Sequence, residues 1–409
     1  MFDVNEIRKH FPMLNKNKTM QGKPLVFLDN ASTTFKPQCV IDAINKYYTE
    51  ETANSHRGDY DLCNKVDSEV MACREVVARF VNSDVNEVVF TNGDTMSLNM
   101  IAYGYGLKHL KKGDEIVLSE GEHASNVLPW FQVSKMTGAK IVYVPLDKEG
   151  MIQTRNLAKV INKNTKVVSL AHVGNVLGYK LNVKEIAEIC HKFGAIFVVD
   201  GAQSVPHFST DFKGWDIDFL TFSGHKLCGP TGIGCLIGKK ALLDDMNPIL
   251  VGGGMNETFT KPDNLIPFEA PAKFEAGTLN LAGIYGLKAA IEFLQTIGMD
   301  NIAHHEANLK KYAIRKLEGS NVIVYNARSE SGILTFNIPN IFPQDEATYL
   351  NYKGIAVRSG QHCDKLLNEF LGMPATCRAS FYFYTTYEEV DALINELLNG
   401  GDILDAYFN

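Results

Sequence analysis

Seven short apolar segments between about residues 86 and 240 constrain the fold of this chain most strongly. They are rich in β-branched residues, they do not alternate between apolar and polar positions, and segments with helical periodicity separate them. Strands that are apolar throughout are typical of a parallel sheet covered by helices on both faces. The pattern therefore predicts an α/β domain with a mostly parallel seven-stranded sheet. Its expected strands lie at 87–90, 115–119, 140–146, 166–173, 195–199, 218–223 and 235–238.

The pattern changes downstream of residue 250. A stretch rich in Gly and Pro has no sustained period and predicts a long loop. Helices are expected at 283–297 and 301–318, and the first of them is long enough to link two domains. The remaining residues alternate between short apolar segments and helical patterns, which is typical of an α+β domain. Its expected strands lie at 322–326, 333–338, 355–359 and 378–386, and its expected helices at 344–353 and 387–399.

The chain has 409 residues, which suffices for two domains with separate apolar cores. We expect the large α/β domain at 26–290 and the small α+β domain, which carries a cysteine-containing loop, at 291–409. Residues 1–25 are expected to pack on the small domain.

Charge and cysteine content limit the partners and the compartment. The chain has 40 Lys and Arg against 47 Asp and Glu, a net charge of −7, which argues against a nucleic-acid or anionic-membrane partner. The eight cysteines are scattered and never form a C-x-x-C motif, so neither a disulfide scaffold nor a metal site is expected. The N-terminus lacks the pattern of a signal peptide, and no stretch approaches the roughly 18 apolar residues of a membrane span. We therefore expect a cytoplasmic protein.

An acid and a lysine follow two neighbouring predicted strands. Asp200 ends the apolar run AIFVVD, and Lys226 follows the next run in the Gly-containing turn SGHK. The carboxyl ends of parallel strands meet at one edge of an open α/β sheet, where such folds bind ligands. Pyridoxal 5'-phosphate (PLP) needs a lysine amine for covalent attachment and an acid that keeps its pyridine nitrogen protonated. The pair therefore favours a PLP site, and a buried Asp–Lys ion pair is the alternative.

A candidate phosphate site precedes this pair in the sequence. Gly93, Asp94 and Thr95 lie between an apolar strand and a helical segment, so free N–H groups and the positive end of a helix dipole can bind an anion there. A strand–Gly–helix junction is common by itself. The usual nucleotide motifs, however, are absent: no G-x-x-x-x-G-K-[ST] sequence occurs, and no G-x-G-x-x-G sequence lies between a strand and a helix. The pattern therefore favours PLP over a nucleotide.

A third candidate site is the segment VRSGQHC at 357–363. Gly360 is expected to make the backbone mobile, while Arg358 and His362 are expected to supply positive potential that favours a thiolate at Cys363. The alternatives are an ordinary loop cysteine and a zinc ligand, but no spacing supplies a fourth ligand for zinc. We therefore expect an exposed, activated thiol.

Segments spread over nearly the whole chain resemble one enzyme family. The chain is similar to class V, fold-type I PLP enzymes of the cysteine desulfurase group, in particular the Suf-type (group II) branch that includes selenocysteine lyases. The SGHK and DGAQS motifs carry the resemblance to the superfamily, and the R-x-G-x-H-C segment with the downstream CRAS narrows it to sulfur chemistry. The matching segments are FLDNASTT (27–34), HRG (56–58), TNGDT (91–95), EHASNVLPW (122–130), HVGNVLG (172–178), VVDGAQS (198–204), FSGHKLCGPTGIG (222–234), FEAGTLN (274–280), RSGQHC (358–363) and CRASFYFYTTYEEVD (377–391).

The resemblance implies a role for each matching residue. Lys226 would bind PLP covalently and move the substrate's α-proton, Cys363 would accept sulfur, and His123 would stack on the cofactor ring. Thr278 would enter the site of a second subunit, which implies a homodimer. The implied cofactor-binding residues are Thr95, Asp94, His123, Asn175, Asp200, Gln203, Ser223, His225, Lys226 and Thr278, and the implied substrate-binding residues are Arg378, Arg358, Asn175 and His56.

The implied reaction converts L-cysteine to L-alanine and leaves a persulfide on Cys363, for iron–sulfur cluster assembly or other sulfur delivery to an acceptor protein. Selenocysteine lyase, cysteine-sulfinate desulfinase and other class V lyases or aminotransferases remain alternatives, as does a non-catalytic partner in sulfur delivery. Two departures from the family pattern stand out. Asp94 replaces the common Thr or Ala, which would repel a phosphate unless it points away, and CDKLLN (363–368) replaces C-A-x-P after the thiol.

Overall fold

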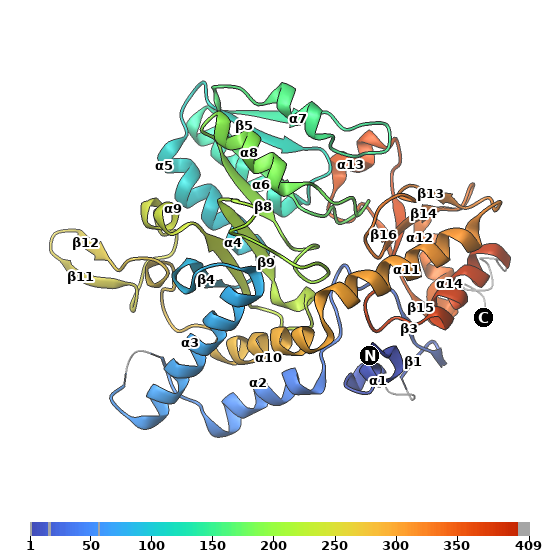
Figure 1. The fold of residues 1–409 in the computed structure, drawn as a ribbon, viewed down its shortest axis with the longest axis horizontal. Helices are drawn as coiled ribbons and strands as arrows, with labels where there is room; N and C mark the ends of the chain where they lie inside the picture. The colour runs from blue at the N-terminus through green and yellow to red at the C-terminus, as the bar shows by residue number, and fades with distance from the viewer. Residues whose placement is uncertain (1, 15–17, 56–57, 400–409) are drawn as a thin grey trace.

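The computed structural model describes residues 2–14, 18–55 and 58–399 and is built around a seven-stranded sheet (Figure 1). The strand order is β4-β10-β9-β8-β7-β5-β6. β10 is antiparallel to both of its neighbours and the other pairs are parallel, which confirms the predicted fold class. The strands are β4 (Val88–Thr91), β5 (Glu115–Ser119), β6 (Lys140–Val144), β7 (Thr165–Ala171), β8 (Ile196–Asp200), β9 (Phe219–Ser223) and β10 (Gly234–Gly238).

The apolar strands supply two cores because consecutive side chains point to opposite faces of the sheet. In β8, Phe197 and Val199 pack in one buried cluster, whereas Ile196 and Val198 pack in the other. Helices cover both faces, which accounts for strands that are apolar without alternation. The helices of this part are α2 (Gln38–Glu50), α3 (Asp61–Val81), α4 (Asp94–Ile101), α5 (Leu107–His109), α6 (Ala124–Thr137), α7 (Thr154–Val160), α8 (Val183–Lys192), α9 (Lys240–Asp245) and α10 (Leu281–Ile297).

α11 (Met299–Leu317) follows α10 and leads into the smaller C-terminal part at the right of Figure 1. That part has a four-stranded sheet of order β13-β14-β17-β16. A short strand outside this sheet, β15 (Ile355–Ala356), pairs in parallel with β3 (Val26–Phe27). The remaining elements are β13 (Ile323–Val324), β14 (Ile333–Asn337), α12 (Pro343–Tyr352), β16 (Arg358–Gly360), α13 (Lys365–Phe370), β17 (Thr376–Ser380) and α14 (Tyr387–Asn399).

The N-terminal segment contains α1 (Val4–Arg8), β1 (Thr19–Met20) and β2 (Lys23–Pro24). Arg8 donates hydrogen bonds to the main-chain carbonyl of Tyr384 (2.6 Å) and to Glu389 (2.8 Å), and the ring of Phe11 packs against Tyr384. The segment is therefore held against the C-terminal part, beside the start of α14.

Three local predictions were wrong. The expected long loop after residue 250 contains a hairpin, β11 (Asn256–Thr260) and β12 (Asn264–Pro267), which projects from the left of the molecule in Figure 1. The strand expected at 378–386 ends at Ser380, because the aromatic residues that follow are buried between cores without pairing in the sheet. The strand expected at 355–359 is two strands with different partners, β15 with β3 and β16 with β17.

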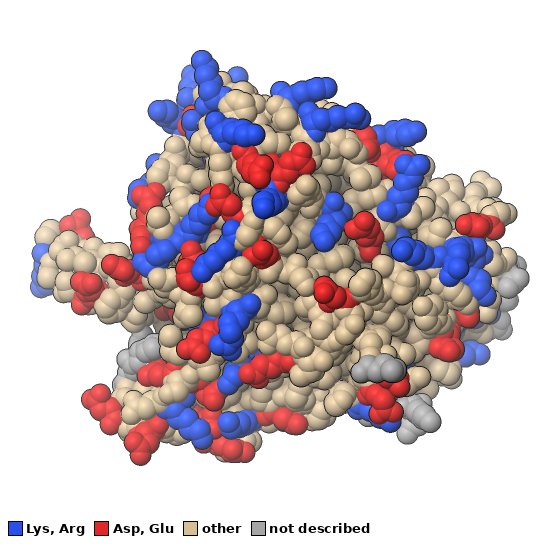
Figure 2. Space-filling view, viewed as in Figure 1, with Lys and Arg blue, Asp and Glu red and all other residues tan. Residues whose placement is uncertain are grey.

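Positive and negative side chains are interspersed over the face shown in Figure 2. No helix within the described ranges combines the length and apolar character needed to cross a bilayer. The described residues also contain no cluster of three or more His, Cys, Asp or Glu side chains arranged to hold a metal ion.

Candidate active site

A cavity of about 200 Å³ lies where β8 and β9 end and where α4 and α6 begin. Residues of the C-terminal part, Arg358, His362 and Arg378, close it on another side. The structure therefore brings together residues that are far apart in the sequence at the edge where open α/β sheets bind ligands. Among the predicted site residues, the cavity is lined by Asp94, Thr95, His123, Asn175, Asp200, Gln203, Ser223, His225, Lys226, Arg358 and Arg378.

Asp200 and Lys226 share this cavity, as the sequence predicted. Asp200 is 4% exposed and its Oδ1 accepts a hydrogen bond from the N–H of Ala202 at 2.9 Å. Burial raises the pKa of Asp200, and the nearby charge of Lys226 opposes this shift. Burial likewise lowers the pKa of Lys226, opposed by the charges of Asp200 and Asp94. A lysine with a lowered pKa is more easily deprotonated, so its amine is available as a nucleophile and a base.

Asp94 adds a second buried carboxyl beside Asp200. It is the first residue of α4, and its Oδ1 is buried without a hydrogen-bond partner among the described residues. Burial and then the charge of Asp200 raise the pKa of Asp94 to about 8. This shift favours the protonated form of the carboxyl, which lessens the repulsion of phosphate that the sequence suggested.

Two helix N-termini converge at one end of the cavity. α4 starts after Gly93, whose φ of 145° suits glycine, and its first N–H, that of Asp94, donates to Ser223 Oγ at 2.8 Å. α6 starts after His123, and the hydroxyl of Ser125 in its first turn lies 2.8 Å from that of Thr95. Helix N-termini and hydroxyl donors bind anions, so this end is suited to a phosphate group. Sequence reasoning missed Ser125, whose signal was its place in the matching segment EHASNVLPW (122–130).

His123 is held as a neutral imidazole. Its Nδ1 accepts a hydrogen bond from the N–H of Ser125 at 3.1 Å. Burial lowers the pKa of His123 to about 4, and the positive charges of Lys226, Arg358 and Arg378 act in the same direction. A neutral, oriented ring of this kind is suited to stacking on a flat aromatic ligand.

Arg378 provides a buried guanidinium in the lining of the same cavity. It donates to Asp29 Oδ1 at 3.2 Å, to Ser32 Oγ at 2.9 Å and to the main-chain carbonyl of Asn175 at 2.8 Å. Its Nε is buried and has no partner among the described residues, which leaves a donor for a bound carboxylate. The Asn175 amide in turn donates to the carbonyl of His362 at 2.9 Å. Sequence reasoning missed Asp29 and Ser32, whose only signal was their place in the FLDNASTT segment.

Cys363 is an exposed free thiol outside the set of residues that line the cavity. Arg358 Nη2 lies 3.7 Å from its Sγ. The expected positive charge from His362 is wrong, because burial lowers the pKa of His362 to about 3 and its Nε2 contacts the Thr376 carbonyl at 3.0 Å. Of the two residues expected to favour a thiolate at Cys363, Arg358 therefore carries the charge.

The model of the family described as "Aminotransferase class-V" matches residues 26–393. The chain belongs to the class V aminotransferase family. Relatives with "Probable cysteine desulfurase" as their name include one from Halalkalibacterium halodurans, 46% identical over 97% of each chain, and one from Staphylococcus aureus, 41% identical over 97% of this chain and 96% of the relative.

Solved structures of two cysteine desulfurases agree with this membership. A cysteine desulfurase of Escherichia coli in an S-sulfonic acid form has a TM-score of 0.90 and 36% identity, covering 99% of each chain. The apo cysteine desulfurase of Thermococcus onnurineus NA1 has a TM-score of 0.91 and 36% identity, covering 97% of this chain and 98% of that one. The class V cysteine desulfurase family and the fold predicted from the sequence are thereby confirmed, and the Suf-type branch stays a prediction.

Class V enzymes of this type use PLP, and the cavity fits this cofactor. Different parts of its lining suit different parts of the cofactor: the acid at the end of β8 can meet the pyridine nitrogen, and the starts of α4 and α6 can bind the phosphate. Buried polar atoms without partners in the described residues, Asp94 Oδ1 and Gln203 Oε1, belong to residues of the same lining. A polar ligand in the cavity would satisfy groups that are otherwise costly to bury.

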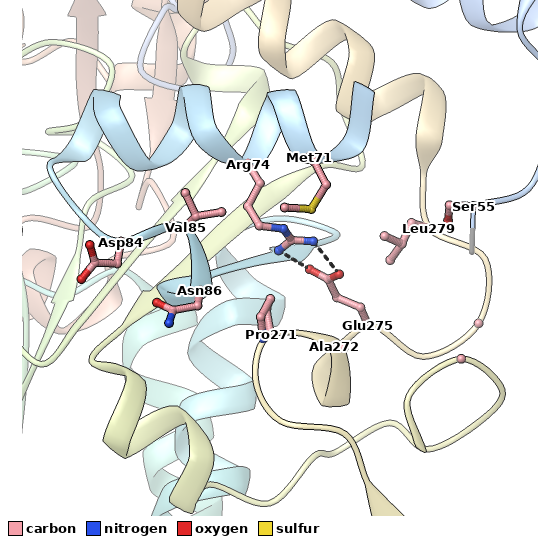
Figure 3. A pocket seen from close by; sticks show the side chains of 12 residues that line it. Ser55, Met71, Arg74, Asp84, Val85, Asn86, Pro271, Ala272, Glu275 and Leu279 are labelled. Atoms are coloured by element: carbon pink, nitrogen blue, oxygen red, sulfur yellow. Dashed lines mark hydrogen bonds and ion pairs between the residues drawn. The ribbon is translucent and has the colours of Figure 1, made fainter. Parts of the chain in front are cut away.

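Besides Cys363, two further predicted site residues are not among the described residues that line this cavity. Thr278 is exposed, and its neighbours Gly277 and Leu279 line a second cavity of about 570 Å³ (Figure 3). His56 lies outside the described residues.

An ion pair between Arg74 and Glu275 lies at the second cavity, where the two side chains point toward each other (Figure 3). Both are nearly buried, and two parallel hydrogen bonds of 2.8 and 2.9 Å join them. Glu275 also accepts the N–H of Phe90 in β4 at 2.9 Å. The pair therefore ties the segment that leads to Thr278 to α3 and to the central sheet.

Arg74→Met is expected to lower the free energy of unfolding by about 3–5 kcal/mol, because it leaves the Glu275 carboxylate buried without its cation. Urea unfolding at a fixed protein concentration measures the change. Arg79→Met on the same helix is the matched control, since its pair with Glu75 is exposed and 3.8 Å long and should change stability by less than about 0.5 kcal/mol. Equal effects of the two substitutions would contradict the importance of the buried pair.

Proposed function

We propose that this protein is a PLP-dependent cysteine desulfurase that converts L-cysteine to L-alanine and transfers the sulfur to Cys363 as a persulfide. The observation that carries the proposal is the shared cavity: Asp200 and Lys226 lie in it together, and the Arg378 guanidinium closes it. Curated relatives that cover 97% of the chain are named cysteine desulfurases, which supports the same activity.

When bound, PLP supplies a ring that accepts electrons from the substrate's α-carbon. Lys226 would hold the cofactor covalently and, once displaced by the substrate amine, carry the α-proton on its Nζ. Asp200 would keep the pyridine nitrogen protonated, and His123 would stack on the ring. Gln203 would contact the ring oxygen, and Thr95, Ser223 and His225 would bind the phosphate.

The substrate's carboxylate would be bound by Arg378 and Asn175, with Arg358 close to the reacting sulfur. The Cys363 thiolate would attack that sulfur, so that one S–S bond forms as the substrate's C–S bond breaks. The electron pair of the broken bond stays with the substrate carbon skeleton, which is protonated to alanine. The domain division proposed from the sequence, 26–290 and 291–409, places Lys226 in the large domain and Cys363 in the small one.

The proposed assembly is a homodimer in which Thr278 of one copy reaches the phosphate in the other. The exposed position of Thr278, away from the cavity of its own chain, supports this arrangement. An acceptor protein would take the sulfur from Cys363, whose exposure allows access, for iron–sulfur cluster assembly or another sulfur-delivery route. All eight cysteines are free, which supports a reducing, cytoplasmic setting.

Purified protein loaded with PLP is expected to release alanine from L-cysteine and to gain one sulfur atom on Cys363. Alanine release measured by chromatography and intact mass measured on the same samples test both products. Parallel assays with selenocysteine and cysteine sulfinate decide the preferred substrate. Protein that takes up PLP but forms no alanine from any of the three would contradict the proposed reaction.

A further inference from the structure

The main-chain carbonyl of His225, directly before Lys226, accepts hydrogen bonds from four groups of one segment. The donors are the Thr34 N–H at 3.1 Å, the Thr34 hydroxyl at 3.1 Å, the Thr33 hydroxyl at 3.2 Å and the Lys36 ammonium at 3.0 Å. A carbonyl oxygen has two lone pairs, so four donors exceed what satisfying it requires. The arrangement restrains the peptide that carries Lys226.

The position of the Lys36 ammonium beside the His225 carbonyl is energetically unfavourable for a cation. It is partly buried, and the hydrogen-bond partners found for its Nζ in the described part of the chain are the carbonyls of Thr34 and His225. Burial lowers the pKa of Lys36 to about 8. Burial also lowers the pKa of the His225 imidazole to about 4, and the charges of Lys226 and then of Lys36 act in the same direction. Withdrawing a cation from water without a carboxylate partner is unfavourable. If this position only filled space, an apolar side chain would be more stable there than Lys36.

The same short segment, residues 29–36, also contacts Arg378 in the lining of the cavity. Asp29 and Ser32 accept hydrogen bonds from Arg378, as described above. Near the end of the segment, the N–H of Phe35 donates to the Tyr384 hydroxyl at 3.0 Å, which anchors the segment to the C-terminal part. The segment therefore spans from the proposed carboxylate-binding arginine to the peptide bond beside Lys226.

We propose that Lys36 is a positioning residue that fixes the direction of the Lys226 side chain through the His225 carbonyl. The inference rests on the proposed function, in which Lys226 binds PLP and moves a proton. Lys36 acts on the lysine and not on the substrate contacts of Arg378, so its loss should slow turnover without weakening cysteine binding. A displacement of about 1 Å at a reacting group can cost on the order of 10²-fold in rate.

Lys36→Met in the PLP-loaded protein is expected to lower kcat by about 10- to 100-fold while KM for cysteine stays within about twofold. The pH at which the visible absorbance of the cofactor bound to Lys226 changes should shift by about half a unit or more, because that band reports the environment of the lysine nitrogen. Lys36→Arg keeps a cation in reach of the carbonyl and should recover most of kcat and the wild-type absorbance profile. Lys9→Met, which removes an exposed ammonium paired with Glu6, is the control and should change neither.

Wild-type kcat and an unchanged absorbance profile in Lys36→Met would overturn the proposal. So would a loss of kcat accompanied by an equal rise in KM and a lowered unfolding midpoint, because that combination indicates general damage to the fold. Borohydride reduction of wild-type protein separates this inference from the function on which it rests. A wild-type protein without a reducible cofactor bond at Lys226 refutes the proposed function itself, whatever Lys36→Met does.

Discussion

Lys226→Ala is expected to abolish the covalent attachment of PLP and to lower turnover of L-cysteine by about 10⁴-fold or more. The substitution removes both the amine that binds the cofactor and the base that carries the α-proton. The Asp200 carboxyl and the helix N-termini at Thr95 and Ser125 remain, so PLP should still bind, but without a covalent bond. Borohydride treatment followed by intact mass measurement detects the attachment, and alanine release measures turnover.

The matched control for this substitution is Lys192→Ala. Lys192 is the last residue of α8 and is exposed, so its removal should leave both the cofactor bond and turnover at the wild-type level. A borohydride-reducible bond that persists in Lys226→Ala would assign the attachment to another lysine and would refute the role of Lys226.

Cys363→Ser is expected to separate cofactor chemistry from sulfur transfer. The cofactor should remain bound to Lys226 and should still change its absorbance on addition of L-cysteine, because the cavity lining is unaltered. Alanine and persulfide formation should fall by about 10³-fold or more, since a serine hydroxyl keeps its proton at neutral pH and is a far weaker nucleophile than a thiolate. Stopped-flow absorbance measures the first part, and alanine release with intact mass measures the second.

Cys39→Ser controls for the loss of an exposed free thiol elsewhere on the surface. It should retain full turnover and a persulfide-bearing protein. Cysteine turnover that is unchanged in Cys363→Ser, or a persulfide that appears on another cysteine in that variant, would show that Cys363 is not the sulfur acceptor. Cys363 was chosen for substitution because the positive charge of Arg358 lies 3.7 Å from its sulfur and favours a thiolate there.

Most strands of the central sheet and the two long helices after it were predictable, because the apolar patterns that indicate them lie within single short segments. Each of the seven expected strands corresponds to one observed strand to within a few residues, and the helices expected at 283–297 and 301–318 are α10 and α11. The predictions failed where a residue's partner lies elsewhere in the chain. The hairpin after residue 250 has mostly exposed residues and therefore no periodic apolar pattern, and the aromatic run after Ser380 is apolar enough to imitate a strand.

In the candidate site, too, some features follow from local sequence and others from contacts between distant segments. The sequence alone determined that an acid and a lysine end two neighbouring strands, because strand order and residue type are enough to place both at one edge of the sheet. The tertiary structure decided that Arg378 lies against Asp29, 349 positions away, and that His362 is neutral. It also decided that four donors meet at the carbonyl before Lys226. Charge state and hydrogen bonding depend on burial and on contacts between distant segments, and neither is encoded in any short stretch of sequence.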